Sequence, residues 1–85
     1  MQIFYSPMFK KRYKKLSREI RVQAQKKEIL FRKNPFELSL GTHKLHGRMS
    51  GLFAFWINKS YRIIFEFRSE NAVRFHTIGK HDIYK

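Results

Sequence analysis

The sequence predicts an α+β domain in which an N-terminal helical hairpin packs on a small antiparallel sheet, in the order β-α-α-β-β-β. Two observations predict this class. Residues 8–33 place apolar side chains at helical spacing among many lysines and arginines, whereas residues 52–78 contain short runs rich in Phe, Ile and Val between polar turns. A chain of 85 residues suffices for one hydrophobic core, so we expect a single domain spanning residues 1–85.

The first strand and the first helix are predicted next to each other. Residues 2–5 favour a pleated strand because they include Ile, Phe and Tyr. Ser6 then suits a helix N-cap, and Pro7 suits the first helical position, which predicts a helix over residues 8–15. The apolar stripe of this helix consists of Phe9, Tyr13 and Leu16.

A second helix is expected to begin at Ser17, with Glu19 in its first turn, where a negative charge favours the helix dipole. Pro35 disfavours helical backbone at the preceding Asn34 and so ends it. The expected core residues of this helix are Ile20, Ala24, Ile29 and Leu30.

Three strands are predicted in the second half, over residues 52–57, 61–67 and 73–78, with polar turns between them. Alternation divides the middle strand into two faces. One face carries Ile63, Phe65 and Phe67, and the other carries Arg62, Ile64 and Glu66. Residues 36–50 show the least regular pattern, so we expect a loop there.

The net charge of +13 is the first indication of function, since 19 basic residues face only 6 acidic ones. Such an excess attracts polyanions, and nucleic acid is the expected partner. An acidic protein partner is also expected to shield this surface. The sequence has no cysteine, so no disulfide is expected. His43 and His46 lie three residues apart, a spacing that could hold a metal on a helix, but Gly41 and Gly47 disfavour a helix there, so neither a metal site nor a cofactor is expected. No apolar run is long enough for a signal peptide or membrane span, which predicts a cytoplasmic protein.

Candidate site residues gather in three clusters at predicted loops or strand ends. They are residues 42–48, the pair Tyr61-Arg62, and residues 79–84. RNA cleavage requires a base for the ribose 2′-OH, an acid for the leaving 5′-oxygen and a cation for the phosphate. Imidazole suits the first two tasks because its pKa lies near neutrality, and the guanidinium fork suits the third. His46 and Lys80 are candidates to contact RNA, and the alternative for His46 is a loop residue that only forms hydrogen bonds.

The clusters together resemble the RelE/ParE superfamily of toxins, and are most similar to its RelE/YafQ-like mRNA interferases. The motifs that carry the resemblance are Asn-Pro after two helices, His-Lys-Leu-His-Gly, Tyr-Arg-Ile-Ile-Phe and the C-terminal Ile-Gly-Lys-His-Asp-Ile-Tyr-Lys. The resemblance implies a metal-independent ribonuclease, often one that cuts mRNA on the ribosome, and a cognate antitoxin that blocks it. Operator DNA is implied as a partner only of the toxin–antitoxin complex.

The resemblance also implies roles for individual residues. His43 and His81 match the catalytic histidines of YafQ-like toxins, as general acid and base in an order left open. Arg62 matches the arginine that RelE-like and YoeB-like toxins direct at the scissile phosphate. Tyr84 matches a near-terminal aromatic residue that stacks on a base or assists proton transfer. The residues similar to those that hold the RNA backbone are Lys44 and Arg48.

Two other functions are compatible with the sequence. A ParE-like poison of DNA gyrase would have the same fold without RNA cleavage and would not need the histidines. A basic RNA-binding domain without catalysis would use aromatic side chains such as Trp56 to stack on bases.

Overall fold

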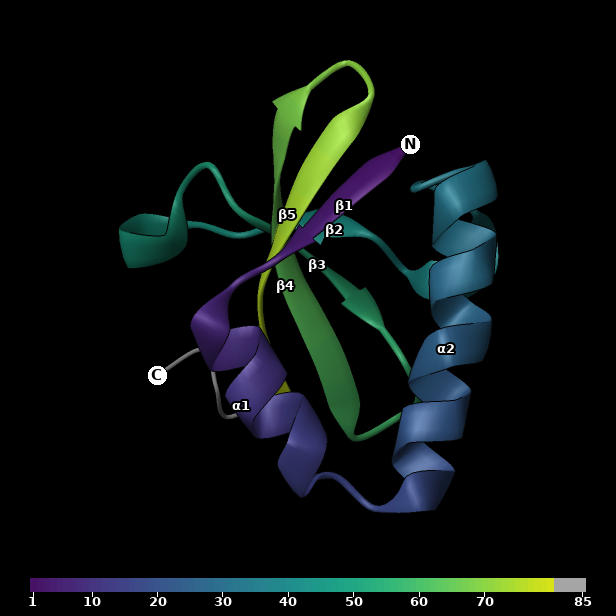
Figure 1. The fold of residues 1–85 in the computed structure, drawn as a ribbon. Helices are drawn as coiled ribbons and strands as arrows, with labels where there is room; N and C mark the ends of the chain where they lie inside the picture. Colours follow the sequence, from purple (N-terminus) through teal and green to yellow (C-terminus); the bar gives the residue numbers. More distant parts are fainter. Residues whose placement is uncertain (81–85) are drawn as a thin grey trace.

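A computed structural model describes residues 1–80 of the chain. The helices are α1 (Pro7–Lys15) and α2 (Arg18–Lys33), and two short 3-10 helices follow, η1 (Leu38–Leu40) and η2 (Gly47–Met49). The strands are β1 (Gln2–Tyr5), β2 (His43–Lys44), β3 (Phe53–Trp56), β4 (Tyr61–Ser69) and β5 (Ala72–Lys80). Within the described residues they form one five-stranded sheet in the order β1-β5-β4-β3-β2. Figure 1 shows α2 on one side of this sheet and η2 projecting on the other.

The predicted helix boundaries are confirmed. Ser6 caps α1, because its Oγ accepts a hydrogen bond of 3.0 Å from the amide of Phe9, and Pro7 occupies the first helical turn. Ser17 caps α2 in the same way, and α2 ends where the amide of Asn34 donates to the carbonyl of Leu30. The helical hairpin predicted from the sequence is therefore present.

The sheet is mixed, whereas the sequence predicted an antiparallel one. β1 runs parallel to β5, with Ile3 opposite Val73 and Tyr5 opposite Phe75, while the other neighbours are antiparallel. Two parallel strands need a long crossover connection, and the chain from α1 to β4 forms this connection between β1 and β5. Ser6 fixes the end of β1, because its amide donates to the carbonyl of Phe75 and its hydroxyl donates to that of His76.

The core is an aromatic cluster on the face of the sheet that α2 covers, with Phe31 at its centre. Its ring lies 4.8 Å from the rings of Phe55 and Phe65 and 5.4 Å from that of Phe75. Ala24 is buried as predicted, but Ile29 is 57% exposed. Phe31 follows Ala24 by seven residues and so shares its helix face, whereas Ile29 follows by five and points away.

Residues 36–50 are more regular than predicted. They contain η1, the two-residue edge strand β2 and η2. Gly41, with φ +58°, ends η1 in the left-handed conformation and turns the chain into β2. His43 therefore lies in an edge strand and not in a loop, and this strand fixes its position relative to β3 and β4.

Candidate active site

The face of the sheet opposite α2, here called the open face, carries His43 and Arg62. His43 lies opposite Ala54, which lies opposite Ile64 in the next strand. In the neighbouring row, Trp56 lies opposite Arg62. Directly opposed residues share a face, as do residues two apart in one strand. The structure thus brings His43 and Arg62 onto one face, one row apart.

Arg62 is held against an aromatic ring. Its guanidinium carbon lies 5.4 Å from the centroid of the Trp56 ring, within the range of a cation–π contact. The indole also packs on Gly41, where an added Cβ would lie 3.3 Å from Trp56 Cδ2. The turn before β2 therefore supports the indole, which in turn orients the guanidinium.

The imidazole of His43 is exposed, and one of its nitrogens has a fixed partner. Nδ1 lies 2.8 Å from the carbonyl oxygen of Gly41. Because a carbonyl only accepts hydrogen bonds, a neutral His43 carries its proton on Nδ1 and leaves Nε2 as the basic nitrogen. This arrangement can remove a proton from a hydroxyl group placed at Nε2.

The other predicted site residues are distributed over both faces. Lys44 lies opposite Phe53, and Lys80 lies opposite Tyr61, so the register places both lysines on the α2 side of the sheet. The structure does not bring these two together with His43. His46 occupies the N-cap position of η2 without a side-chain capping hydrogen bond, and Arg48 lies within η2. Both are exposed beside the open face.

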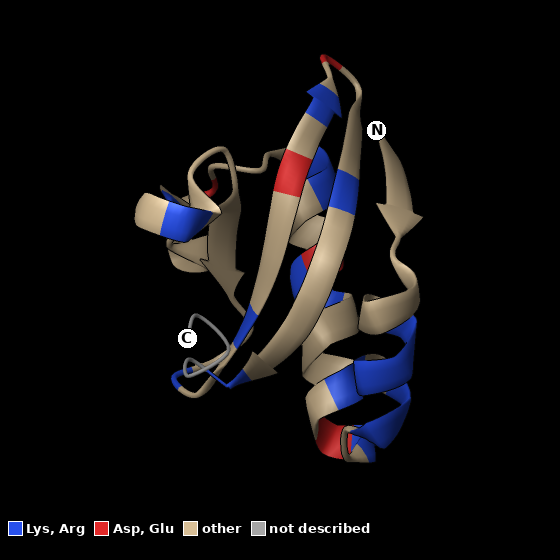
Figure 2. Cartoon of the chain, turned by 90° about the vertical axis from the view of Figure 1, so that its left-hand side faces the viewer, with Lys and Arg blue, Asp and Glu red and all other residues tan. Residues whose placement is uncertain are grey.

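Figure 2 looks onto this open face, with η2 and α1 on opposite flanks and basic positions on both. Two predicted catalytic residues, His81 and Tyr84, lie outside the described residues.

The open face also carries a polar cluster of Glu66, Arg68 and His76, which the sequence did not predict. His76 Nε2 lies 3.2 Å from Glu66 Oε1, to which Arg68 also donates at 3.0 Å. These partners, the hydrogen bond from Arg68 first, hold the pKa of Glu66 below its usual value. His76 is an extra residue in β5, because Ile64 pairs with Thr77 while Phe65 pairs with Phe75. Such a β-bulge has no clear signal in the sequence.

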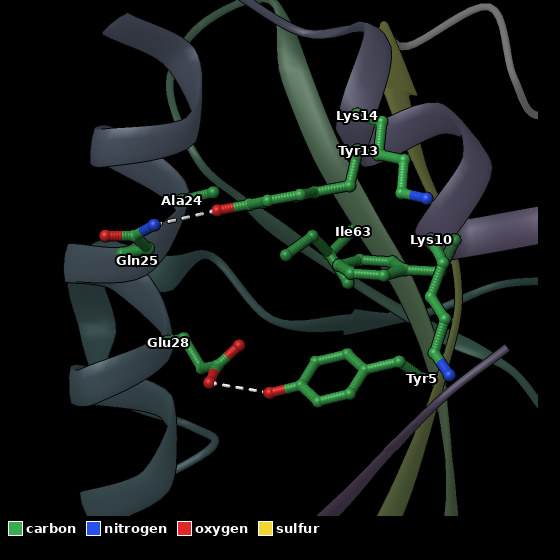
Figure 3. Close-up of a pocket in the computed structure, with 9 residues that line it drawn as sticks. Tyr5, Lys10, Tyr13, Lys14, Ala24, Gln25, Glu28 and Ile63 are labelled. Carbon is green, nitrogen blue, oxygen red and sulfur yellow. Dashed lines mark hydrogen bonds between the residues drawn. The ribbon is translucent and has the colours of Figure 1, made fainter. Parts of the chain in front are cut away.

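The α2 side of the sheet carries a different feature. A hollow of about 370 Å³ lies between α1, α2 and β1, with an apolar floor that includes Phe9 and Ile63. Figure 3 shows Lys10 and Lys14 at its border. The same view shows the hydroxyl of Tyr5 donating to Glu28 at 2.8 Å and the amide of Gln25 donating to Tyr13 at 2.9 Å.

Residues 1–80 meet the requirements of neither a metal site nor a membrane-spanning helix. That part of the chain contains no group of three or more His, Asp or Glu side chains placed to hold a metal ion. Among the same residues, no helix is both long and apolar enough to cross a membrane.

No protein-family model and no curated protein matches the sequence, but solved structures match the fold closely. YafQ from E. coli strain BL21(DE3) superposes with a TM-score of 0.81 at 18% identity, covering 98% of this chain and 96% of that one. A YoeB/ParE toxin from Agrobacterium tumefaciens gives 0.80 at 14%, covering 95% and 99%. The YoeB–YefM complex from Staphylococcus aureus gives 0.78 at 18%, covering 95% and 97%. The chain therefore has the fold of the RelE/ParE superfamily toxins.

Proposed function

We propose that residues 1–85 form a single toxin domain of a type II toxin–antitoxin system, which cleaves mRNA on the ribosome without a metal ion. The observation that carries this proposal is the shared placement of His43 and Arg62 on the open face of a toxin fold. Both side chains have the chemistry that phosphodiester cleavage requires. The net charge of +13 supports a polyanionic substrate.

In the proposed reaction, Nε2 of His43 removes the proton of a ribose 2′-OH. The 2′-oxygen then bonds to the adjacent phosphorus while the bond from phosphorus to the 5′-oxygen breaks. Arg62 stabilises the negative charge on the phosphate oxygens, with Trp56 restricting its guanidinium. With His43 as the base, we assign the protonation of the leaving 5′-oxygen to His81. The resemblance implies that Tyr84 stacks on a base or assists proton transfer. The products are a 2′,3′-cyclic phosphate and a 5′-hydroxyl.

The proposed partners follow from the same surfaces. mRNA and ribosomal RNA would contact the open face, with His46 and Arg48 at its border. An acidic antitoxin suits the hollow between the helices, because its floor is apolar and its border carries Lys10 and Lys14. The matching solved structures include toxin–antitoxin complexes, YoeB–YefM from Staphylococcus aureus and RelBE2 from Mycobacterium tuberculosis. Translation as the target places the proposed action in the cytoplasm.

The test is primer extension on an mRNA translated in vitro with purified ribosomes. We expect new ends within codons, and we expect Arg62→Ala or His43→Ala to reduce the cleavage rate about 100-fold or more. The matched control is Arg18→Ala, which removes an exposed arginine from the start of α2. Cleavage that persists in the Arg62 and His43 variants would overturn the assignment. Inhibition of gyrase supercoiling without new mRNA ends would identify a ParE-like poison instead.

A further inference from the structure

The open face contains an apolar slot in addition to the His43–Arg62 site. It has a volume of about 340 Å³ and lies between the first turn of α1 and the segment around η2. Met8 forms one wall, Met49 and Leu52 form the other, and Ile64 and Thr77 form the floor. Ile64 and Thr77 are buried within the sheet, whereas Met8 is 53% exposed. The slot is therefore a recess with a rigid floor and an open mouth.

Polar groups border one side of this slot. His76 and Arg74 line it there. Thr77 Oγ1 accepts a hydrogen bond of 2.9 Å from Arg12, so its own proton can be donated to another group. Apolar walls with a few polar groups at one edge match the requirements of a small ring that has apolar faces and donors and acceptors on its rim.

The position of the slot connects it to the proposed cleavage site. Ile64 lies two residues from Arg62 on the same face of β4, which is about 7 Å along a strand. Ile64 also lies in the row of His43, across Ala54. A chain bound with one phosphate at Arg62 can therefore place a neighbouring group in the slot.

We infer that the slot takes one nucleobase of the single-stranded RNA whose scissile phosphate lies at Arg62. The mostly apolar lining disfavours a phosphate, which would lose its hydration there, and favours the faces of a base. The cations Arg12 and Arg74 border the recess, where the backbone on either side of that base would pass. This inference rests on the proposed function for the identity of the ligand.

The methionines provide the test, because the chain has three of them and two line the slot. Protein labelled with ¹³C at the methionine methyl groups would be titrated with a 2′-O-methyl oligoadenylate of four nucleotides, which cannot be cleaved. We expect the Met8 and Met49 signals to move and saturate together. The signal of Met1, which packs against the core, should stay in place. An oligomer of the same length with abasic sugars should leave all three signals unmoved.

Variants make the test quantitative. The double variant Met8→Ala, Met49→Ala should bind the oligoadenylate roughly tenfold more weakly, since it removes apolar contacts that two side chains make with the base. The control Ile29→Ala, on the exposed side of α2, should bind normally, and circular dichroism would verify folding.

Equal shifts with the abasic oligomer, or no shift at either methionine, would show that the slot does not bind a nucleobase, even if Arg62-dependent cleavage is observed. Base-dependent shifts without cleavage would support the slot and contradict the nuclease.

Discussion

At the scale of single residues, the candidate site depends on how Trp56 is supported. The indole contacts Gly41 and also lies against the guanidinium of Arg62, and these contacts join the turn before β2 to the neighbouring strands β3 and β4. Short sequence motifs identified Arg62 and His43, but no local pattern indicated that Trp56 contacts both a glycine and an arginine. That contact arises from the register of β3 with β4, which is a property of the assembled sheet.

We predict that Gly41→Ala reduces the free energy of unfolding by about 1–2 kcal/mol and changes the fluorescence of Trp56, the only tryptophan. The cost arises because Gly41 has φ +58° and because the new Cβ would press on the indole. The matched control is Gly47→Ala, at φ +67° with no atom within 4 Å of an added Cβ. The control should lose similar stability with unchanged emission, and an altered emission in both variants would contradict the contact.

At the scale of elements, the sequence predicted the bounds of the helices better than the way in which the elements pair and pack. Caps and prolines are local signals, so the bounds of α1 and α2 were confirmed. The parallel placement of β1 beside β5 depends on contacts between residues about 70 positions apart, and no local pattern encodes it. The same holds for the bulge at His76, which places an imidazole next to Glu66. His81 and Tyr84 remain predictions because they lie outside the described residues.

The attachment of β1 to α2 gives a prediction about pH. The hydroxyl of Tyr5 donates to Glu28, and Arg32 donates to the carbonyl of Met1. Burial, and then the hydrogen bond to Glu28, raises the pKa of Tyr5 above its usual value of 10.0. A raised pKa means that the folded state holds the proton more tightly than the unfolded state. This stabilisation is complete below pH 10 and is lost as the pH rises through the pKa of the folded state.

We therefore predict that Tyr5→Phe costs about 1 kcal/mol at pH 7 and flattens the decline of stability above pH 10. Urea denaturation at pH 7, 9 and 10.5 would measure both effects. Tyr13→Phe, which removes the other hydroxyl of the same hollow, is the matched control for the lost oxygen atom. A wild-type protein whose stability declines no more steeply above pH 10 than that of Tyr5→Phe would contradict the linkage.

At the scale of the whole molecule, the basic residues are divided between two faces, and α1 shows this most clearly. Met8 lines the slot and Arg12 bonds to Thr77, so this side of α1 borders the open face. Helical periodicity places Lys11 and Lys15 on the same side. Lys10 and Lys14 border the hollow on the α2 side of the sheet instead. One helix thus presents two lysines to each of the two proposed partners.

This division allows a test that compares two variants in which the same amount of charge is removed from different faces. The double variants Lys11→Gln, Lys15→Gln and Lys10→Gln, Lys14→Gln each lower the net charge from +13 to +11. If single-stranded RNA binds the open face, the first pair should reduce the dependence of affinity on salt by roughly 1 unit of log–log slope. The second pair should change it little, because only phosphates in contact release counterions. Fluorescence anisotropy at several salt concentrations would measure the slopes. Equal slopes in the two variants would show that RNA responds to total charge alone, and binding would then not be specific to the face that carries His43 and Arg62.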